Sequence, residues 1–260
     1  MVARLDNGIF ITVDVKDYNG RMLYLCGMAY PEVVDTCRYL LRSGDCFLDI
    51  GANYGAVGLS CSDIVGADGG VYLFEPQPNL CQRLRAAIEE QNLSRVQLHE
   101  VGLMDRDDVL EMSLLDNHSG EASFVFNQQE SANKIRLEVK NIATYLPPLL
   151  AGRSFGSKVD VEGAEPYLLP WLIQQQQMRF VVFENTHLPI QERKHLFESM
   201  TGNGFTLFGV KNKGSQTYLD HFSDPEDYSR YHDLLAVRIK PSLSIPHRLR
   251  PDILHTLQQT

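Results

Sequence analysis

The sequence predicts an α/β protein with a mostly parallel central sheet that is covered by helices on both faces. From residue 46 onward, short apolar runs typical of buried strands alternate with segments whose apolar spacing is typical of helices. Two late apolar runs, 205–210 and 234–239, predict a pair that closes the sheet with an antiparallel strand. No long polar linker interrupts the alternation, so we expect residues 1–260 to form a single domain.

Residues 1–45 are expected to precede the main sheet as a β-hairpin and a helix. The hairpin is predicted from β-branched residues in 8–15 and a returning apolar run at 22–26, with turn-forming residues between them. The helix is predicted over 33–41 from its apolar spacing.

Residues 46–240 form the predicted core region, and its elements follow in order. Strands are expected at 46–50, 70–74, 96–99, 109–115, 122–126, 135–139, 157–161 and 180–183. Helices are expected at 56–65, at 79–91 with Asn79 as the N-cap, from Ala164 onward, and at 191–200. Residues 241–260 contain three prolines and are expected to form a peripheral tail, or alternatively an arm of a homo-oligomer.

Composition argues against several classes of protein. The chain has 24 Lys and Arg against 33 Asp and Glu, and this net charge of −9 disfavours a nucleic-acid partner. No apolar run is long enough to predict a membrane span, and the N-terminus lacks the apolar core of a secretory signal. The five cysteines form no C-x-x-C pair, which favours reduced thiols and a cytoplasmic location.

A glycine-rich turn follows the first core strand and predicts a nucleotide-type cofactor site. Residues Phe47 to Gly58 read F-L-D-I-G-A-N-Y-G-A-V-G, so the spacing differs from the G-x-G-x-x-G of dinucleotide sites. We expect Gly51 and Gly55 to allow close approach of the ligand, and the next helix to point its first amides at it. Asp49 would repel a pyrophosphate but suits the ammonium of a methionine group.

Glu75 ends the second core strand within F-E-P-Q-P and is the predicted partner of a ribose diol. A carboxylate there also opposes a 2′-phosphate. Both NAD and S-adenosylmethionine carry the diol, so an NAD-dependent oxidoreductase stays the alternative on this residue alone. The glycine spacing and Asp49 together favour S-adenosylmethionine.

Four segments carry a resemblance to a known family: D-I-G-A-N-Y-G-A-V-G-L, Y-L-F-E-P-Q-P-N, K-V-D-V-E-G-A-E-P-Y-L-L and V-V-F-E-N-T-H. Together they resemble the FkbM family of S-adenosylmethionine-dependent methyltransferases over residues 8–239. The resemblance implies a Rossmann-like class I methyltransferase fold and transfer to hydroxyl oxygens of sugars and natural products. The cofactor-binding residues it implies, together with the turn and strand pattern, are Asp49, Gly51, Asn53, Tyr54, Gly55, Glu75, Pro76 and Gly102.

The later strand ends supply candidates for the reaction. A hydroxyl acceptor needs a base or a metal ion to make it nucleophilic. Asp160 and Glu162 are expected on one face of their strand, and His187 is a candidate base near neutral pH. Lys158 is either an ion-pair partner for an acid or a solvated lysine at a strand edge. Glu165 is expected to interact with the dipole of the helix that it begins.

Oxygen-bearing side chains at two strand ends also allow a metal ion. Asp160, Glu184 and Asn185 are candidate ligands of magnesium or calcium, or else ordinary hydrogen-bonding groups. The polar segment 116–133 is expected to bind a polyhydroxylated acceptor, or to be a solvated hairpin.

These observations predict an O-methyltransferase that acts on a hydroxyl of a sugar, glycolipid or polyketide-like metabolite. The expected partner is a small-molecule or glycan hydroxyl acceptor. A noncatalytic module that binds S-adenosylmethionine is a further alternative. A nucleic-acid N-methyltransferase would need an Asn/Asp-Pro-Pro-aromatic loop, which the sequence lacks.

Overall fold

The computed structural model of the chain describes residues 1–115, 117–123, 133–186, 190–213, 216–221 and 230–238. Its main sheet has eight strands in the order β13-β12-β14-β11-β10-β3-β4-β5. The strands of this sheet are β3 (Cys46–Ile50), β4 (Gly70–Phe74), β5 (Val96–His99), β10 (Phe155–Val159), β11 (Met178–Glu184), β12 (Thr206–Lys213), β13 (Gln216–His221) and β14 (Asp233–Val237).

The predicted sheet is confirmed. Strands β11, β10, β3, β4 and β5 are parallel neighbours, and β14 pairs antiparallel with β11. Strand β12 then pairs antiparallel with both β14 and β13, which extends the closing pair to three strands.

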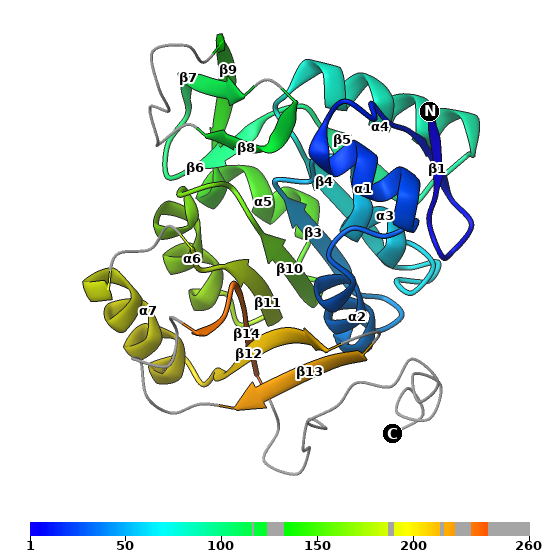
Figure 1. Cartoon of the computed structure of the whole chain (residues 1–260). Coiled ribbons are helices and arrows are strands. Elements are labelled where there is room, and N and C mark those ends of the chain that lie inside the picture. Colours follow the sequence, from blue (N-terminus) through cyan, green and yellow to red (C-terminus); the bar gives the residue numbers. More distant parts are fainter. Residues whose placement is uncertain (116, 124–132, 187–189, 214–215, 222–229, 239–260) are drawn as a thin grey trace.

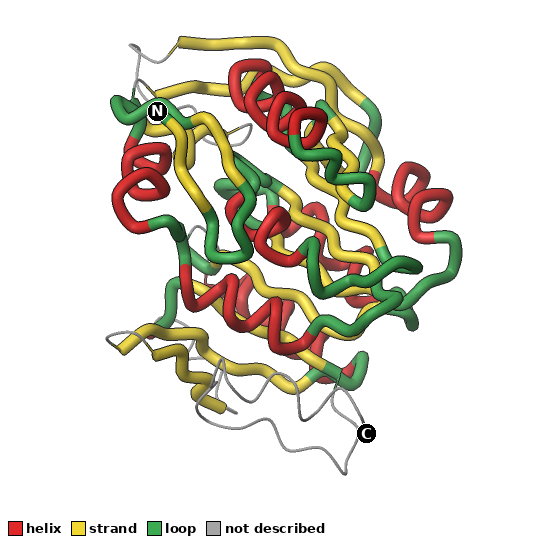
Figure 2. The backbone as a smooth tube through the Cα atoms, turned by 90° about the vertical axis from the view of Figure 1, so that its right-hand side faces the viewer, coloured by secondary structure: helices red, strands yellow, loops and turns green. Residues whose placement is uncertain are grey.

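Helices cover both faces of the sheet, and Figure 2 shows them in front of the strands and behind them. Their bounds are α1 (Tyr18–Cys26), α2 (Pro31–Leu40), α3 (Ala56–Cys61), α4 (Pro78–Glu90), α5 (Ile142–Leu150), α6 (Glu165–Gln174) and α7 (Ile190–Gly202). Strand β3 separates two apolar cores: Phe47 packs into one with helices α2 to α4, and Leu48 packs into the other with helices α5 to α7. Burial on both faces explains why this strand is an unbroken apolar run apart from Asp49. Within the described residues, no helix combines the length and the apolar character needed to cross a membrane.

A second, four-stranded sheet lies beside the main one (Figure 1). It has the order β6-β9-β7-β8, and its strands are β6 (Gly102–Met104), β7 (Asp108–Leu115), β8 (His118–Ser123) and β9 (Asn133–Asn141). Strand β8 contacts α1, which brings the start of the chain against this sheet.

The N-terminal hairpin exists, but one of its predicted strands was wrong. The paired strands are β1 (Val2–Arg4) and β2 (Phe10–Thr12), whereas residues 22–26 lie in α1. Asp17 decides the difference, because its Oδ2 accepts a hydrogen bond from Gly20 N at 2.8 Å and so caps a helix. Gly27 ends that helix in the left-handed conformation with φ of 68°.

Other boundaries also differ from the sequence prediction. Helix α3 ends at Cys61, four residues before the predicted end, and the cap of α4 is Gln77 where Asn79 was predicted. Strand β10 ends at Val159, so Asp160 and Glu162 lie in the loop that follows it. Helix α5, strand β6 and strand β13 were not predicted. The predicted tail 241–260 lies outside the described residues.

Candidate active site

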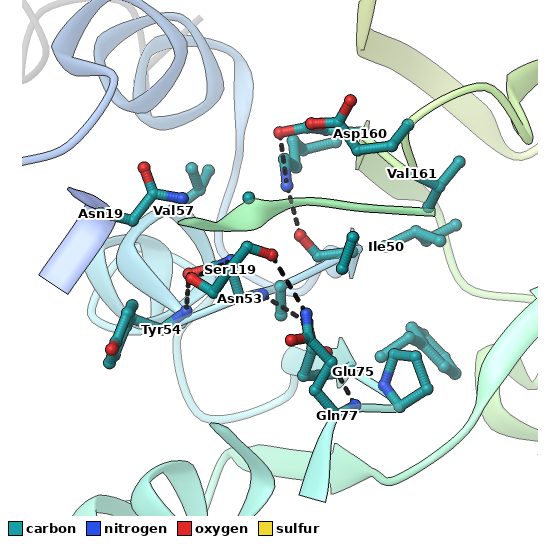
Figure 3. Close-up of a pocket in the computed structure, with 18 of the residues that line it drawn as sticks. Asn19, Ile50, Asn53, Tyr54, Val57, Glu75, Gln77, Ser119, Asp160 and Val161 are labelled. Carbon is teal, nitrogen blue, oxygen red and sulfur yellow. Dashed lines mark hydrogen bonds and ion pairs between the residues drawn. The ribbon is translucent and has the colours of Figure 1, made fainter. Parts of the chain in front are cut away.

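A cavity lies at the carboxyl ends of β3, β4 and β10, and we call it the first cavity. Parallel α/β sheets bind their ligands at this edge. The cavity's polar lining includes Asn53, Glu75, Gln77, Ser119 and Asp160, which Figure 3 labels. The predicted cofactor-binding residues that line the first cavity are Gly51, Asn53, Tyr54, Glu75, Pro76 and Gly102.

Gly51 holds the glycine turn against the loop that follows β10. Its φ is 76°, and a Cβ atom there would come within 1.9 Å of the carbonyl oxygen of Asp160. The need for glycine at this position therefore comes from a contact between two loops, in addition to any approach of a ligand. Gly55, which does not belong to the lining, has φ of 72°, and a Cβ atom there would lie 2.6 Å from Leu84.

Asp49 is fully buried beneath the first cavity and is not part of its lining. Its Oδ2 accepts a hydrogen bond from Gly58 N at 2.8 Å, and its Oδ1 lies 3.5 Å from Lys158 Nζ. Asp49 therefore does not line the cavity in which the sequence analysis expects it to meet a ligand ammonium. The carboxylate instead fixes the short helix α3 and a buried lysine, which confirms the ion-pair interpretation of Lys158.

Glu75 lines the first cavity from the end of β4 and is almost completely buried. Its Oε2 accepts a hydrogen bond from Asn53 N at 2.8 Å, and its Oε1 accepts one from Gln77 N at 2.9 Å. Burial raises the pKa of Glu75 to about 7, although these two amides oppose the shift. Each carboxylate oxygen keeps a further acceptor site, so a diol can still bind to it.

Strand β8 lines the first cavity through Ser119, Gly120 and Ala122. Ser119 N donates to Asp17 Oδ1 at 2.6 Å, and Asn53 Nδ2 donates to Ser119 Oγ at 3.0 Å. Gln77 Nε2 donates to the carbonyl of Ser119 at 3.2 Å, and Figure 3 shows Asn53 and Gln77 meeting at Ser119. The strand is thereby tied to α1, to the glycine turn and to the cap of α4.

A second cavity adjoins the first and extends towards β11 and β14. The two share a wall formed by Tyr30, Val57, Gly120, Lys158, Asp160 and Glu162. At one side of the second cavity, the rings of Tyr18 and His118 stack with their centroids 5.0 Å apart. Two molecules, one bound in each cavity, would therefore meet at the loop that follows β10.

Three carboxylates converge in the second cavity, two from the loop that follows β10 and one from the end of β11. Single oxygen atoms of Asp160, Glu162 and Glu184 lie within 4.8 Å of one another. Burial raises the pKa of Glu162, and the negative charges of Glu184 and Asp160 raise it further, to about 9. Burial and Asp160 raise the pKa of Glu184 to about 8. This cluster can hold a proton near neutral pH, and its oxygen atoms also suit a hard divalent cation.

A model of the methyltransferase FkbM domain matches residues 49–207, which is more than half of the chain. The chain belongs to the FkbM methyltransferase family. It is an S-adenosylmethionine-dependent methyltransferase, in agreement with the sequence prediction. No curated protein matches it.

The solved structures to which this chain is similar include methyltransferases of very different sequence. A precorrin-6y C5,15-methyltransferase from Geobacter metallireducens shares 10% identity at a TM-score of 0.45, covering 80% of this chain and 87% of its own. An S-adenosylmethionine-dependent O-methyltransferase from Thermotoga maritima shares 9% identity at 0.44, covering 94% and 79%. Fibrillarin from Aeropyrum pernix, with natively bound S-adenosyl-L-methionine, shares 14% identity at 0.38, covering 91% and 98%.

Three further residues that the sequence analysis of this FkbM methyltransferase named lie outside the linings of both cavities or outside the described residues. His187 lies outside the described residues. Asn185 is buried beside the second cavity, where its N–H donates to the carbonyl of His232 at 2.9 Å. Glu165 accepts hydrogen bonds from Val161 N and Gly163 N, both at 2.9 Å, so its carboxylate shapes the loop that carries Asp160.

Several residues of the site were missed at the sequence level. His232 Nε2 lies 3.4 Å from Glu184 Oε1, and its Nδ1 lies 3.2 Å from Asp233 Oδ2. The hydrogen bond to Asp233 and the nearby Glu184 raise the pKa of His232 to about 9, against the effect of burial. Asp17 and Ser119 were missed because they meet across 102 residues of sequence. The available sequence signal for Asp17 was its position three residues before Gly20, where an aspartate can cap a helix.

Proposed function

We propose that this FkbM methyltransferase transfers a methyl group to a hydroxyl oxygen of an uncharged, hydroxyl-rich small molecule or glycan. The observation that carries the proposal is the carboxylate cluster of Asp160, Glu162 and Glu184 in the second cavity. Carboxylates accept hydrogen bonds from hydroxyl groups, and they repel phosphates and other anions. The same argument disfavours a nucleic-acid acceptor, since Lys158 is already paired with Asp49 and Asp160.

The first cavity is the proposed binding site of S-adenosylmethionine. Glu75 would accept hydrogen bonds from the ribose hydroxyls, and Gly51, Asn53, Tyr54, Pro76 and Gly102 would contribute the surrounding surface. The residues fit a cationic cofactor, because the wall between the cavities carries the carboxylates of Asp160 and Glu162. When bound, this cofactor supplies an electrophilic methyl group.

The chain's own residues supply orientation and a base. The hydroxyl would lie at the shared wall, where Asp160 or Glu162 accepts its proton as the oxygen–carbon bond forms and the carbon–sulfur bond breaks. In its deprotonated form, Glu162, whose pKa is raised to about 9, is a stronger base than an exposed carboxylate, and this form becomes more populated as the pH rises towards 9. The products are a methyl ether and S-adenosylhomocysteine.

The test is a methyl-transfer assay with S-adenosylmethionine and three groups of acceptors. These are neutral sugars and polyols, their phosphorylated counterparts, and an RNA oligonucleotide. We expect mass spectrometry to find methyl ethers of neutral acceptors, and a loss of more than tenfold in Glu162→Gln but not in the exposed control Glu138→Gln. Methylation confined to RNA or to nitrogen atoms would overturn the proposal.

A cytoplasmic location is also proposed. All five cysteines are free, and Cys37, Cys46, Cys61 and Cys81 are buried as thiols. Such thiols suit a reducing compartment. Cell fractionation with an antibody to the chain would test the location.

A further inference from the structure

Lys158 connects the two cavities at their shared wall. It lies on β10, and its side chain is 8% exposed. Its Nζ donates to the carbonyl of Gly51 at 2.6 Å, and it lies 3.5 Å from Asp49 Oδ1 and 3.3 Å from Asp160 Oδ2. Gly51 belongs to the glycine turn of the first cavity, whereas Asp160 belongs to the carboxylate cluster of the second.

The contacts of Lys158 are one hydrogen bond, to the carbonyl of Gly51, and two ion-pair contacts, to Asp49 and Asp160. All three are to the protein, so the ammonium holds two loops and a buried carboxylate together at one point. The contacts differ in where they lie. Asp49 is fully buried, so its ion pair with Lys158 lies in the protein interior. Gly51 lines the first cavity, and Asp160 lines both cavities.

We propose that Lys158 is a positioning residue that sets the distance between the cofactor turn at Gly51 and the acceptor-side carboxylate of Asp160. This inference rests on the proposed function only in taking Asp160 as an acceptor-side group. Transfer between two bound molecules depends steeply on their alignment, and a displacement of about 1 Å can lower the rate on the order of 100-fold. Loss of Lys158 should therefore lower kcat far more than it raises the KM for S-adenosylmethionine.

A plain Lys158→Met variant would leave Asp49 as a buried, unpaired carboxylate and could unfold the chain. The comparison therefore uses Asp49→Asn as the reference and the double variant D49N/K158M as the test, because Asn can still accept from Gly58 N. Thermal unfolding of the two variants checks that both are folded. A third variant, D49N/K158R, restores a cation at the same position.

The proposal predicts a kcat at least tenfold lower for D49N/K158M than for D49N, with KM for S-adenosylmethionine and Kd for S-adenosylhomocysteine changed less than threefold. D49N/K158R should recover part of the kcat. Equal kcat values for D49N and D49N/K158M would overturn the proposal and leave Lys158 as a mere partner of Asp49. An unfolded D49N/K158M beside a folded D49N/K158R would overturn it as well, since the lysine would then act on stability.

The outcome is separable from that of the proposed function. The kcat comparison uses whichever acceptor the assay identifies, and a nitrogen acceptor would contradict hydroxyl transfer while leaving the Lys158 effect in place. A crystal structure of D49N/K158M with S-adenosylhomocysteine needs no acceptor at all. It should show Asp160 displaced from its position beside Gly51, and an unmoved Asp160 would contradict the positioning role.

Discussion

Ser119 and Asp17 are joined by two hydrogen bonds although 102 residues separate them in the chain. Ser119 N donates to Asp17 Oδ1 at 2.6 Å, and Ser119 Oγ donates to Asp17 Oδ2 at 3.1 Å. The same Asp17 carboxylate caps α1 through Gly20 N. One side chain thus both starts the first helix and holds β8 over the first cavity.

Ser119→Ala should speed the release of S-adenosylhomocysteine. The variant removes the hydroxyl that bonds Asp17 and Asn53 but keeps the backbone N–H. Hydrogen bonds of this kind contribute about 0.5–1.5 kcal/mol each, so we expect affinity to fall by up to about tenfold. Isothermal titration and stopped-flow dissociation measure this. Ser113→Ala, in the neighbouring strand and outside the lining of both cavities, is the control.

Glu75→Ala should weaken S-adenosylhomocysteine binding by about 1–3 kcal/mol, because charged hydrogen bonds to the ribose are lost. Glu75→Gln should weaken it less, since one acceptor oxygen remains. Titration calorimetry compares both with Glu89→Gln on the exposed face of α4. Wild-type affinity in Glu75→Ala would contradict the ribose assignment.

Gly51→Ala should destabilise the chain more than Gly152→Ala. The two glycines have nearly equal φ values, 76° and 75°, but a Cβ atom at Gly152 meets nothing within 4 Å. The Gly152 variant therefore reports the cost of the left-handed conformation alone, about 1–2 kcal/mol. The Gly51 variant adds a clash with the carbonyl of Asp160. Urea unfolding measures the free energy of unfolding of both variants. Equal losses of this free energy would mean that the glycine turn and the loop at Asp160 move apart without an energetic cost.

The free energy of unfolding without ligands should fall as the pH rises from about 5 to 9. Burial raises the pKa of Glu75 to about 7 and, together with Glu184 and Asp160, that of Glu162 to about 9. In this window the folded chain keeps protons that the unfolded chain has released, so higher pH favours unfolding. Glu162→Gln should flatten the fall above pH 8 in thermal unfolding curves. A steeper fall in that variant would contradict the raised pKa.

Chelation tests the alternative role of the carboxylate cluster. We expect methyl transfer to persist after dialysis against EDTA, because Lys158 already places a positive charge 3.3 Å from Asp160. His232 likewise lies 3.4 Å from Glu184. Loss of activity that Mg²⁺ or Ca²⁺ restores would instead assign Asp160, Glu162 and Glu184 to a metal ion.

The parallel strands and the cofactor turn were predictable because their signals are local. The buried runs at β3, β4 and β10 and the glycine turn each occupy a few consecutive residues. Residues 22–26 were wrongly predicted as a strand, since their apolar character fits either element and the cap at Asp17 is what selects the helix.

The contacts between distant segments were not predictable from patterns. Asp49 was expected to face the ligand, but it forms an ion pair in the interior with Lys158, which lies on the neighbouring strand. His232 reaches Glu184 only because β14 runs antiparallel to β11. Such pairings depend on strand order, and the sequence alone left that order open.

One strand of the four-stranded sheet, β8, contributes to both cavities, while β6 and β7 add Gly102, Leu103 and Met112 to the first cavity alone. Ser119 and Ala122 of β8 line the first cavity, His118 and Glu121 line the second, and Gly120 lines both. None of these five residues belongs to the main sheet. A protein engineer could therefore exchange His118 and Glu121, which line only the second cavity, to redirect the enzyme to other acceptors, while Gly102, Ser119, Glu75, Lys158 and the glycine turn stay untouched.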